Sequence, residues 1–367
     1  MTDASRESSA SESAPPPEYK LVAELPLTVD GYDYEQFSQE TSSGFTRVTT
    51  VFELRGDNAT GCGEDVTYDT ADHERLAEAI DAGTFSLPTG KVTFGEFSAA
   101  LDETELFPGE GPERDVSHDY RRWGVEAAAL DLALRQNDTA LSDLLDRSYQ
   151  PVRFVASTRL GDPPTTARVD AIRSRNPDVG FKLDPTPAWD AELVADLRAR
   201  DAVRVVDLKG HYEGTDVDAE AGPEFYRRIV EGFPDAVLED PLLTEETRPI
   251  FDGEEGRVSW DSPIHSLDDV LALPWEPSWL NTKPSRFGTV ESLFRVLRWA
   301  LERGVNLYGG GQFELSVGRA QAHELASLYY PDGPNDLAPS VYNEESLPPE
   351  LPRSPIGVPA DHEGFGF

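Results

Sequence analysis

Carboxylates and lysines recur in the second half of the chain, each close behind a short apolar run. In sequence order they are Lys182, Asp184, Asp207, Lys209, Glu239, Asp261 and Lys283. From Lys182, steps of 25, 32, 22 and 22 residues lead to Asp207, Glu239, Asp261 and Lys283 in turn. Each step fits one strand–helix unit. The spacing therefore predicts that these side chains meet at the carboxyl ends of parallel strands.

These residue types suit metal-assisted acid–base chemistry. Three carboxylates on successive units are the oxygen ligands that Mg²⁺ prefers. A lysine near a metal can lose its proton and act as a base, then return it as an acid. Removing the weakly acidic proton α to a carboxylate requires a charge-stabilising cation and a positioned base. In an acidic protein, one carboxylate at a strand end is expected by chance. Three carboxylates on successive units, close to three of the five lysines in the chain, are not.

The composition argues against partners that need a basic or a long apolar surface. The chain has 367 residues, with 69 Asp+Glu against 32 Lys+Arg, and a formal charge of −37. Such a surface repels nucleic acid and anionic membranes. No apolar run approaches the roughly 18 residues that a spanning helix needs, and Cys62, the only cysteine, excludes a disulfide framework. We expect a cytoplasmic protein with neither nucleic-acid nor membrane partners.

The acidic excess with so few lysines is also typical of a halophilic surface. Carboxylates hold hydration in concentrated salt, where ions screen their mutual repulsion. We therefore expect the fold to lose stability on dilution into low salt.

The apolar pattern divides the chain into segments. Residues 1–17 have little to bury and are predicted to form a disordered acidic Ser/Pro tail. Residues 18–120 mix a β-like run at 47–54 with helical stretches, which predicts an α+β domain. From 121 to 330, apolar runs alternate with amphipathic stretches, as in a closed barrel of βα units. The runs are 152–157, 179–183, 203–208, 236–238, 258–260, 279–282 and 305–308. Residues 331–367 are predicted to be a return segment.

Short motifs accompany these elements. They are Gly61-Cys-Gly-Glu64, 127–134, Leu238-Glu239-Asp240-Pro241, 261–266, 281–288 and 314–318. In this order, over roughly residues 45–330, they resemble the enolase superfamily. The closest resemblance is to its muconate-lactonizing branch, which includes o-succinylbenzoate synthases, and the chain is identified as a divergent member.

The resemblance implies a fold, a cofactor and a reaction class. The fold is α/β: a modified (β/α)8 TIM barrel with an N-terminal α+β capping domain, toward which the return segment packs. Mg²⁺, or Mn²⁺ in its place, would bind Asp207, Glu239 and Asp261. The reaction is that of a lyase or isomerase that abstracts the proton α to the carboxylate of a small-molecule acid and passes through an enediolate. Cycloisomerisation, epimerisation or racemisation, and synthase-like elimination all stay open, as does a homo-oligomeric state.

Two positions depart from that branch. Its second strand ends in Lys-x-Lys, whereas here Asp184 follows Lys182 at the second lysine position. Its third strand often carries Asn two residues after the metal aspartate, whereas here Lys209 stands there and faces the same side as Asp207. We predict Lys283 as one acid/base and either Lys182 or Lys209 as its counterpart.

Further residues are predicted to contact the substrate, and two alternative functions stay open. The contacts are Tyr68, Asp184, Arg286, Gln312 and Glu314. An acid-sugar dehydratase of the mandelate racemase type would use a histidine on the late strands, which residues 305–318 lack. His211, just beyond Lys209, and His265, four residues after Asp261, could reach the mouth, whereas His323 is expected to pack or lie at the surface. A non-catalytic relative that binds metal and acid is favoured by the acid at position 184.

Overall fold

A computed structural model describes residues 14–40, 45–211, 222–344, 346–359 and 362–367 of the chain. Most of the predicted disordered tail, residues 1–13, lies outside the described residues. Its last residue, Pro17, already begins helix α2 (Pro17–Ala23). Within the described part, no helix is long and apolar enough to cross a membrane.

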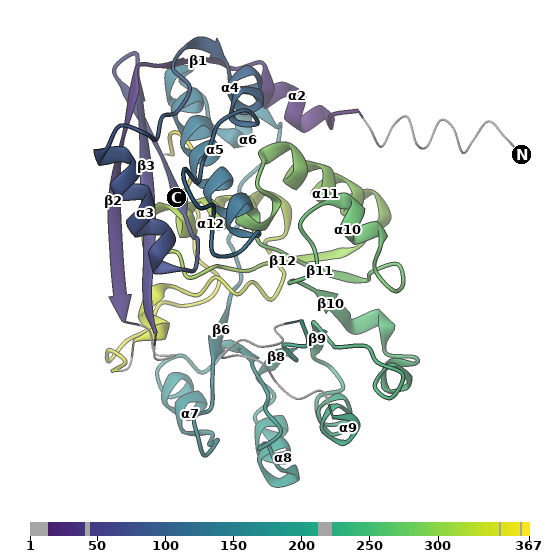
Figure 1. Ribbon diagram of the computed structural model, residues 1–367. Coiled ribbons are helices and arrows are strands. Elements are labelled where there is room, and N and C mark those ends of the chain that lie inside the picture. Colours follow the sequence, from purple (N-terminus) through teal and green to yellow (C-terminus); the bar gives the residue numbers. More distant parts are fainter. Residues whose placement is uncertain (1–13, 41–44, 212–221, 345, 360–361) are drawn as a thin grey trace, which may run out of the picture.

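The N-terminal part is built on an antiparallel meander of β2 (Gly31–Glu40), β3 (Thr46–Gly56) and β4 (Ala59–Asp65) (Figure 1). Asp57 and Asn58 join β3 to β4 with φ angles of 46° and 63°, the left-handed conformation that a two-residue hairpin favours between twisted strands. The strand predicted at 47–54 is thus confirmed. The other elements are β1 (Pro26–Val29), β5 (Gly90–Thr93), α3 (Thr70–Asp81), α4 (Phe94–Leu101) and α6 (Leu141–Leu144).

Helix α5 (Ser117–Gln136) crosses the meander at backbone contact. A Cβ atom on Gly61 would lie 2.1 Å from the backbone nitrogen of Leu132. One on Gly63 would lie 2.1 Å from the carbonyl oxygen of Gly124. The two glycines of the Gly-Cys-Gly-Glu motif are therefore required because β4 packs directly against α5.

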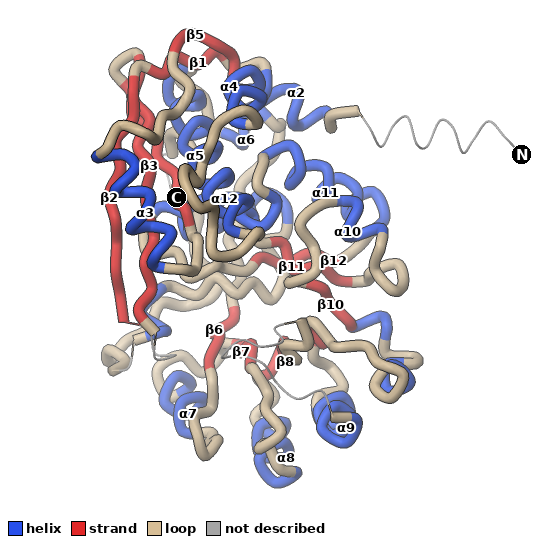
Figure 2. The backbone as a smooth tube through the Cα atoms, viewed as in Figure 1, coloured by secondary structure: helices blue, strands red, loops and turns tan. Residues whose placement is uncertain are grey.

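In the described residues of the second part, seven parallel strands form, one in each predicted apolar run, and they pair in sequence order (Figure 2). They are β6 (Val155–Thr158), β7 (Gly180–Leu183), β8 (Val203–Asp207), β9 (Val237–Glu239), β10 (Val258–Trp260), β11 (Trp279–Thr282) and β12 (Asn306–Gly309). The helices are α7 (Ala167–Arg173), α8 (Ala191–Ala199), α9 (Pro223–Gly232), α10 (Leu267–Leu271), α11 (Val290–Arg303) and α12 (Val317–Tyr329). Short 3₁₀ helices are η1 (Arg248–Phe251), η2 (Glu255–Arg257), η3 (Pro284–Phe287) and η4 (Ser340–Asn343).

A two-residue bridge closes the seven-stranded sheet. Asn335 pairs in parallel with Phe154, just before β6, and Asp336 pairs in parallel with Gly310, just after β12. The Asp336 amide donates to the carbonyl of Gly309 at 2.8 Å. The predicted (β/α)8 barrel under an N-terminal α+β domain is therefore confirmed, with its eighth position reduced to this bridge.

The structure shows which elements lie at two of the predicted segment boundaries. The boundary predicted between residues 120 and 121 falls inside α5. The closing bridge at 335–336 lies within the predicted return segment. Beyond it, Phe365 donates its backbone N–H to Asp131 of α5 at 2.7 Å, so the end of the chain packs against the helix that carries the meander.

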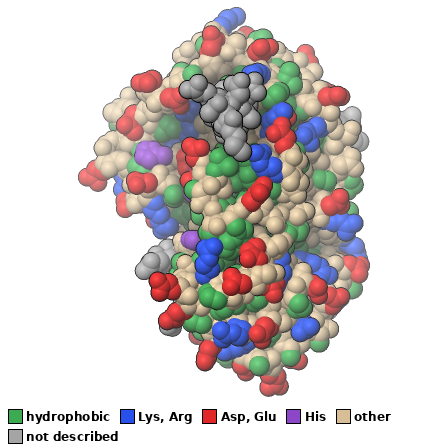
Figure 3. Space-filling view, turned by 90° about the vertical axis from the view of Figure 1, so that its right-hand side faces the viewer, with side chains coloured by type: hydrophobic (Ala, Val, Ile, Leu, Met, Phe, Trp, Pro, Cys, Tyr) green, Lys and Arg blue, Asp and Glu red, His purple; other side chains and the backbone are tan. Residues whose placement is uncertain are grey.

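The barrel has an apolar interior separate from the main core. Val205, Val237 and Tyr308 form a small cluster with Trp279, whereas the large core lies among the helices and the outer strand faces. On the exterior, acidic side chains are spread over the face in Figure 3 rather than gathered in one patch.

Candidate active site

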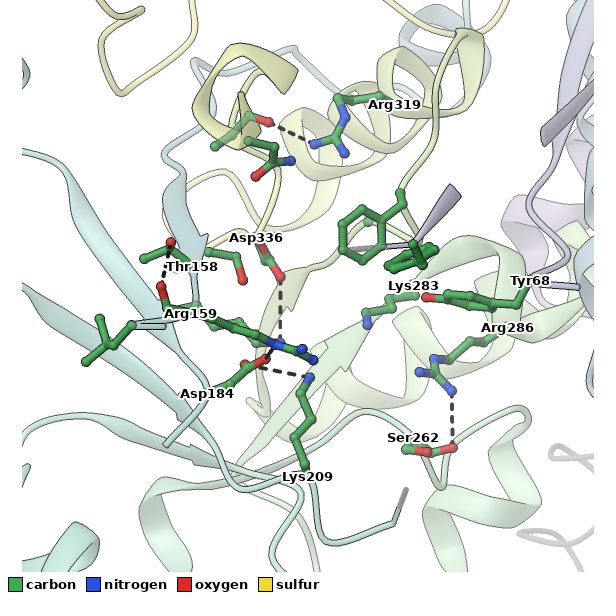
Figure 4. A pocket seen from close by; sticks show the side chains of 18 of the residues that line it. Tyr68, Thr158, Arg159, Asp184, Lys209, Ser262, Lys283, Arg286, Arg319 and Asp336 are labelled. Carbon is green, nitrogen blue, oxygen red and sulfur yellow. Dashed lines mark hydrogen bonds and ion pairs between the residues drawn. The ribbon is translucent and has the colours of Figure 1, made fainter. Parts of the chain in front are cut away.

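A cavity of about 900 Å³ lies at the carboxyl ends of the barrel strands (Figure 4). The barrel contributes Lys182, Asp184, Lys209 and Lys283 to its lining. Tyr68 of the N-terminal part also reaches the cavity, so the two parts of the chain share one site.

The three predicted metal carboxylates are fully buried at the ends of neighbouring strands. Asp207 ends β8, Glu239 ends β9 and Asp261 follows β10. Side chains two apart on a strand share a face. Because Val205 and Val237 point into the barrel, Asp207 and Glu239 do so as well.

Asp240 holds the end of β10 in place. Its two carboxylate oxygens accept the backbone N–H groups of Asp261 and Ser262, both at 2.8 Å. Asp240 itself has a left-handed φ of 48°. Burial, reinforced by the nearby Asp261 carboxylate, raises the pKa of Asp240 to about 7. The position of Asp261 thus depends on a buried acid that the sequence shows only as part of a Glu-Asp-Pro motif.

Lys182 lies deepest among the lysines and bridges carboxylates. Its Nζ is 3.1 Å from Asp207 Oδ2 and 3.7 Å from Asp336 Oδ2, and it also donates to Glu239. Burial alone would lower the pKa of Lys182, but the carboxylates of Asp207 and Glu239 raise it well above the usual value. Lys182 is therefore held as a buried ammonium.

Lys209 and Lys283 each pair with one of the three carboxylates, Lys209 with Asp207 and Lys283 with Asp261. Lys209 contacts Asp207 and has a φ of 53°, while Lys283 Nζ lies 2.8 Å from Asp261 Oδ2. In Figure 4 their ammonium groups point toward each other from different strands. Burial opposes ionisation of Asp261, yet the cations of Arg286 and Lys283 lower its pKa to about 2.

Glu239 has partners that were not predicted from the sequence. It accepts hydrogen bonds from the hydroxyl of Tyr308 and, at 3.2 Å, from Asn281 Nδ2. Burial, and then the negative charge of Asp207, raises the pKa of Glu239 well above its usual value. Tyr308 ends the apolar run at 305–308 and reads as a core residue in the sequence, since nothing there signals that its hydroxyl is needed.

The predicted substrate contacts separate into two groups. Tyr68, Asp184 and Arg286 line the cavity. Gln312 and Glu314 are buried behind its wall: Gln312 accepts a hydrogen bond from the Tyr68 hydroxyl at 2.7 Å, and Glu314 lies 3.5 Å from Arg319. Arg319 and Asp336 are among the cavity residues that were missed, the latter because it lies on the closing bridge.

The histidines considered for a dehydratase are engaged in other contacts. His323 is buried in α12 and its Nε2 lies 2.7 Å from the carbonyl of Leu337. His265 lines the cavity, and its Nδ1 lies 3.0 Å from Asp119 Oδ2 and 3.0 Å from the carbonyl of Arg286.

The donor set fits a divalent cation in kind. Asp207, Glu239 and Asp261 supply hard oxygen ligands from adjacent strands. Burial, and then the charge of Asp207, raises the pKa of Glu239, and a cation held by these oxygens would favour its ionised form. Among the described residues, no three ligand side chains already converge as a metal site, and lysine and arginine groups contact these oxygens.

Family models match both parts of the chain. Residues 20–144 match the N-terminal domain, and residues 148–344 the C-terminal domain, of "Domain of unknown function (DUF8230)". The chain is also similar to the o-succinylbenzoate synthase of Bacillus subtilis (strain 168), with 24% identity over 259 residues that cover 66% of this chain and 67% of the relative.

Solved structures share the fold. A member of the enolase superfamily from Enterococcus faecalis V583 aligns with a TM-score of 0.63 and 18% identity, covering 84% of this chain and 86% of the other. Muconate lactonizing enzyme from Pseudomonas putida aligns with a TM-score of 0.61 and 18% identity, covering 84% and 88%. The resemblance indicated by the motifs is thus confirmed by sequence and by fold.

Proposed function

Since the chain belongs to the DUF8230 family and is a divergent relative of enolase-superfamily enzymes, we propose that it is a Mg²⁺-dependent lyase or isomerase. Its substrate would be a small-molecule carboxylic acid that loses its α-proton in the cavity. Asp207, Glu239 and Asp261 would hold the cation, with Mn²⁺ as a substitute. When bound, the cation supplies positive charge against the negative charge that develops on the substrate carboxylate.

The observation that carries this proposal is the placement of two lysines. Lys209 follows β8 and Lys283 follows β11, so in the order of the sheet they stand at either end of the strands β8, β9 and β10 that carry the three carboxylates. Both line the cavity. An acid–base pair on opposite faces of a substrate α-carbon could remove a proton from one side and deliver one from the other.

Lys182 would take a different role from Lys209. Its side chain is only 2% exposed and contacts three carboxylates, whereas the Lys209 side chain is 16% exposed. Lys209 also contacts two carboxylates, those of Asp184 and Asp207, but its greater exposure leaves its ammonium group more accessible to a bound substrate. We therefore assign the second acid/base role to Lys209 and a charge-balancing role to Lys182.

A second candidate is a non-catalytic relative that binds an acid without turnover. The observation that favours it is the pairing of Lys209 and Lys283 with Asp207 and Asp261, which would hold both lysines as ammonium groups. Catalysis requires that a bound cation and substrate release at least one of these pairs.

Exchange of the α-proton with solvent deuterium separates the two candidates. We would incubate the protein in D₂O and molar KCl with Mg²⁺ and a panel of N-acyl amino acids, dipeptides and 2-hydroxy acids, and follow the α-proton by NMR. Exchange should occur with at least one class, stop with EDTA and be lost in Lys283→Ala and Lys209→Ala. Lys91→Ala, at an exposed lysine of the N-terminal part, is the matched control and should retain the exchange. Binding of panel acids without any exchange would contradict the proposed enzymatic activity and support the non-catalytic candidate.

A further inference from the structure

Three neighbouring strands place a cation, an anion and a cation beside one another in the cavity. Arg159 follows β6, Asp184 follows β7 and Lys209 follows β8. Asp184 lies between the other two: its Oδ2 is 3.5 Å from Arg159 Nε and its Oδ1 is 3.7 Å from Lys209 Nζ. Figure 4 shows the charged ends of both side chains close to this carboxylate.

This arrangement differs from a tight structural ion pair. Charge-assisted hydrogen bonds are usually about 2.7–2.9 Å long, well below both distances at Asp184. Its Oδ1 atom is buried and accepts no hydrogen bond from any described residue. A buried acceptor without a donor is costly in a folded protein, so a donor supplied by a bound molecule would satisfy it.

Among the side chains that line the cavity, basic residues outnumber acidic ones. Its basic residues are Arg114, Arg159, Arg168, Lys182, Lys209, Lys283, Arg286 and Arg319, and its acidic residues are Asp184 and Asp336. Such a lining attracts anions. Asp184 neutralises it at one place, the position between Arg159 and Lys209.

We propose that Asp184 determines substrate specificity by acting as a built-in carboxylate in the anion position formed by Arg159 and Lys209. A substrate with a second carboxylate at that end would meet a like charge there. A substrate with an uncharged hydrogen-bond donor there, such as a hydroxyl group, would donate to Oδ1 without adding a third positive charge beside Arg159 and Lys209. The preferred substrates are therefore acids with one carboxylate and a donor at the far end.

The inference deepens the proposed function, and equilibrium binding tests it without turnover. The probes are straight-chain acids of four, five and six carbons with a methyl, a hydroxyl or a carboxylate group at the far end, beginning with butyrate, 4-hydroxybutyrate and succinate. Affinities would be measured calorimetrically with Mg²⁺ present. In the wild type the hydroxy acid should bind more tightly than the diacid at the best chain length.

Substituting the acid should reverse this preference. In Asp184→Asn, which keeps the shape of the side chain, the diacid should gain about tenfold or more relative to the methyl-terminated acid, as expected when a like charge is removed from a partly buried site. Arg159→Gln should have little effect in the wild type but should abolish the gain in Asp184→Asn, a coupling that a double-mutant cycle measures. Thermal melts of each variant check folding.

Several outcomes would overturn the inference. They are a wild type that prefers the diacid, an unchanged ratio in Asp184→Asn, and the absence of binding by all probes in both forms. Loss of proton exchange counts against the proposed function alone, because none of these binding ratios depends on turnover.

Discussion

Glu64 tests how the N-terminal part is attached to the barrel. Its carboxylate is 1% exposed and accepts the backbone N–H groups of Leu315, Ser316 and Gly318, at distances from 2.7 to 3.2 Å. These amides lie at the start of α12, so Glu64 satisfies the N-terminus of a barrel helix from another part of the chain. In Glu64→Ala all three lose their acceptor.

The expected loss follows from these contacts. A buried donor left unsatisfied costs about 1–3 kcal/mol, and three half-buried amides that regain some water should together cost about 2–4 kcal/mol. Glu64→Gln keeps one acceptor oxygen and should lose about half as much.

Urea unfolding measures this difference in the free energy of unfolding. Glu35→Ala, at an exposed position on β2, is the matched control and should change stability by less than about 0.5 kcal/mol. A Glu64→Ala protein as stable as this control would refute the reasoning.

The remaining predictions concern the buried pair of Arg121 and Asp65 and the surface charge. Their atoms Nε and Oδ2 lie 2.8 Å apart at 1% and 0% side-chain exposure, so Arg121→Met should lose about 3–5 kcal/mol in urea unfolding; a loss near zero would contradict this. Burial opposes ionisation of Asp65, but Arg121 keeps its pKa below the usual 3.8. The stabilisation that ionised Asp65 contributes is therefore complete above the unfolded pKa of about 3.9 and is lost as pH falls through the folded pKa. The free energy of unfolding of Asp65→Asn should fall less steeply in acid than that of the wild type. Equal slopes would contradict a stabilising role for the Asp65 carboxylate. With a formal charge of −37, the melting temperature should drop on dilution from molar KCl to low salt, and equal melting in both would exclude the salt adaptation.

Much of the site could be predicted because strand geometry is periodic. Each short apolar run became a strand, and a side chain two residues beyond an inward-facing position must also face inward. That rule carries Asp207 and Glu239 to the barrel interior from Val205 and Val237. Spacing along the chain then brings Asp261 to the same end.

What could not be predicted depends on contacts between distant segments. Asp336 reaches the cavity from a two-residue bridge, which is too short to leave an apolar run. Gln312 lies behind the wall, next to Phe313, whose φ is 56°. Arg47 fixes this segment by donating to the carbonyls of Gln312 and Phe313. No local pattern in the sequence announces such a link.

The most direct test of the central claim is a crystal structure grown in molar salt with Mn²⁺ and a carboxylic acid that binds. The account predicts an anomalous peak bounded by Asp207, Glu239 and Asp261, with Lys209 and Lys283 on opposite sides of the acid's α-carbon. Carboxylates that keep their lysine partners, with no anomalous peak among them at saturating Mn²⁺, would contradict it.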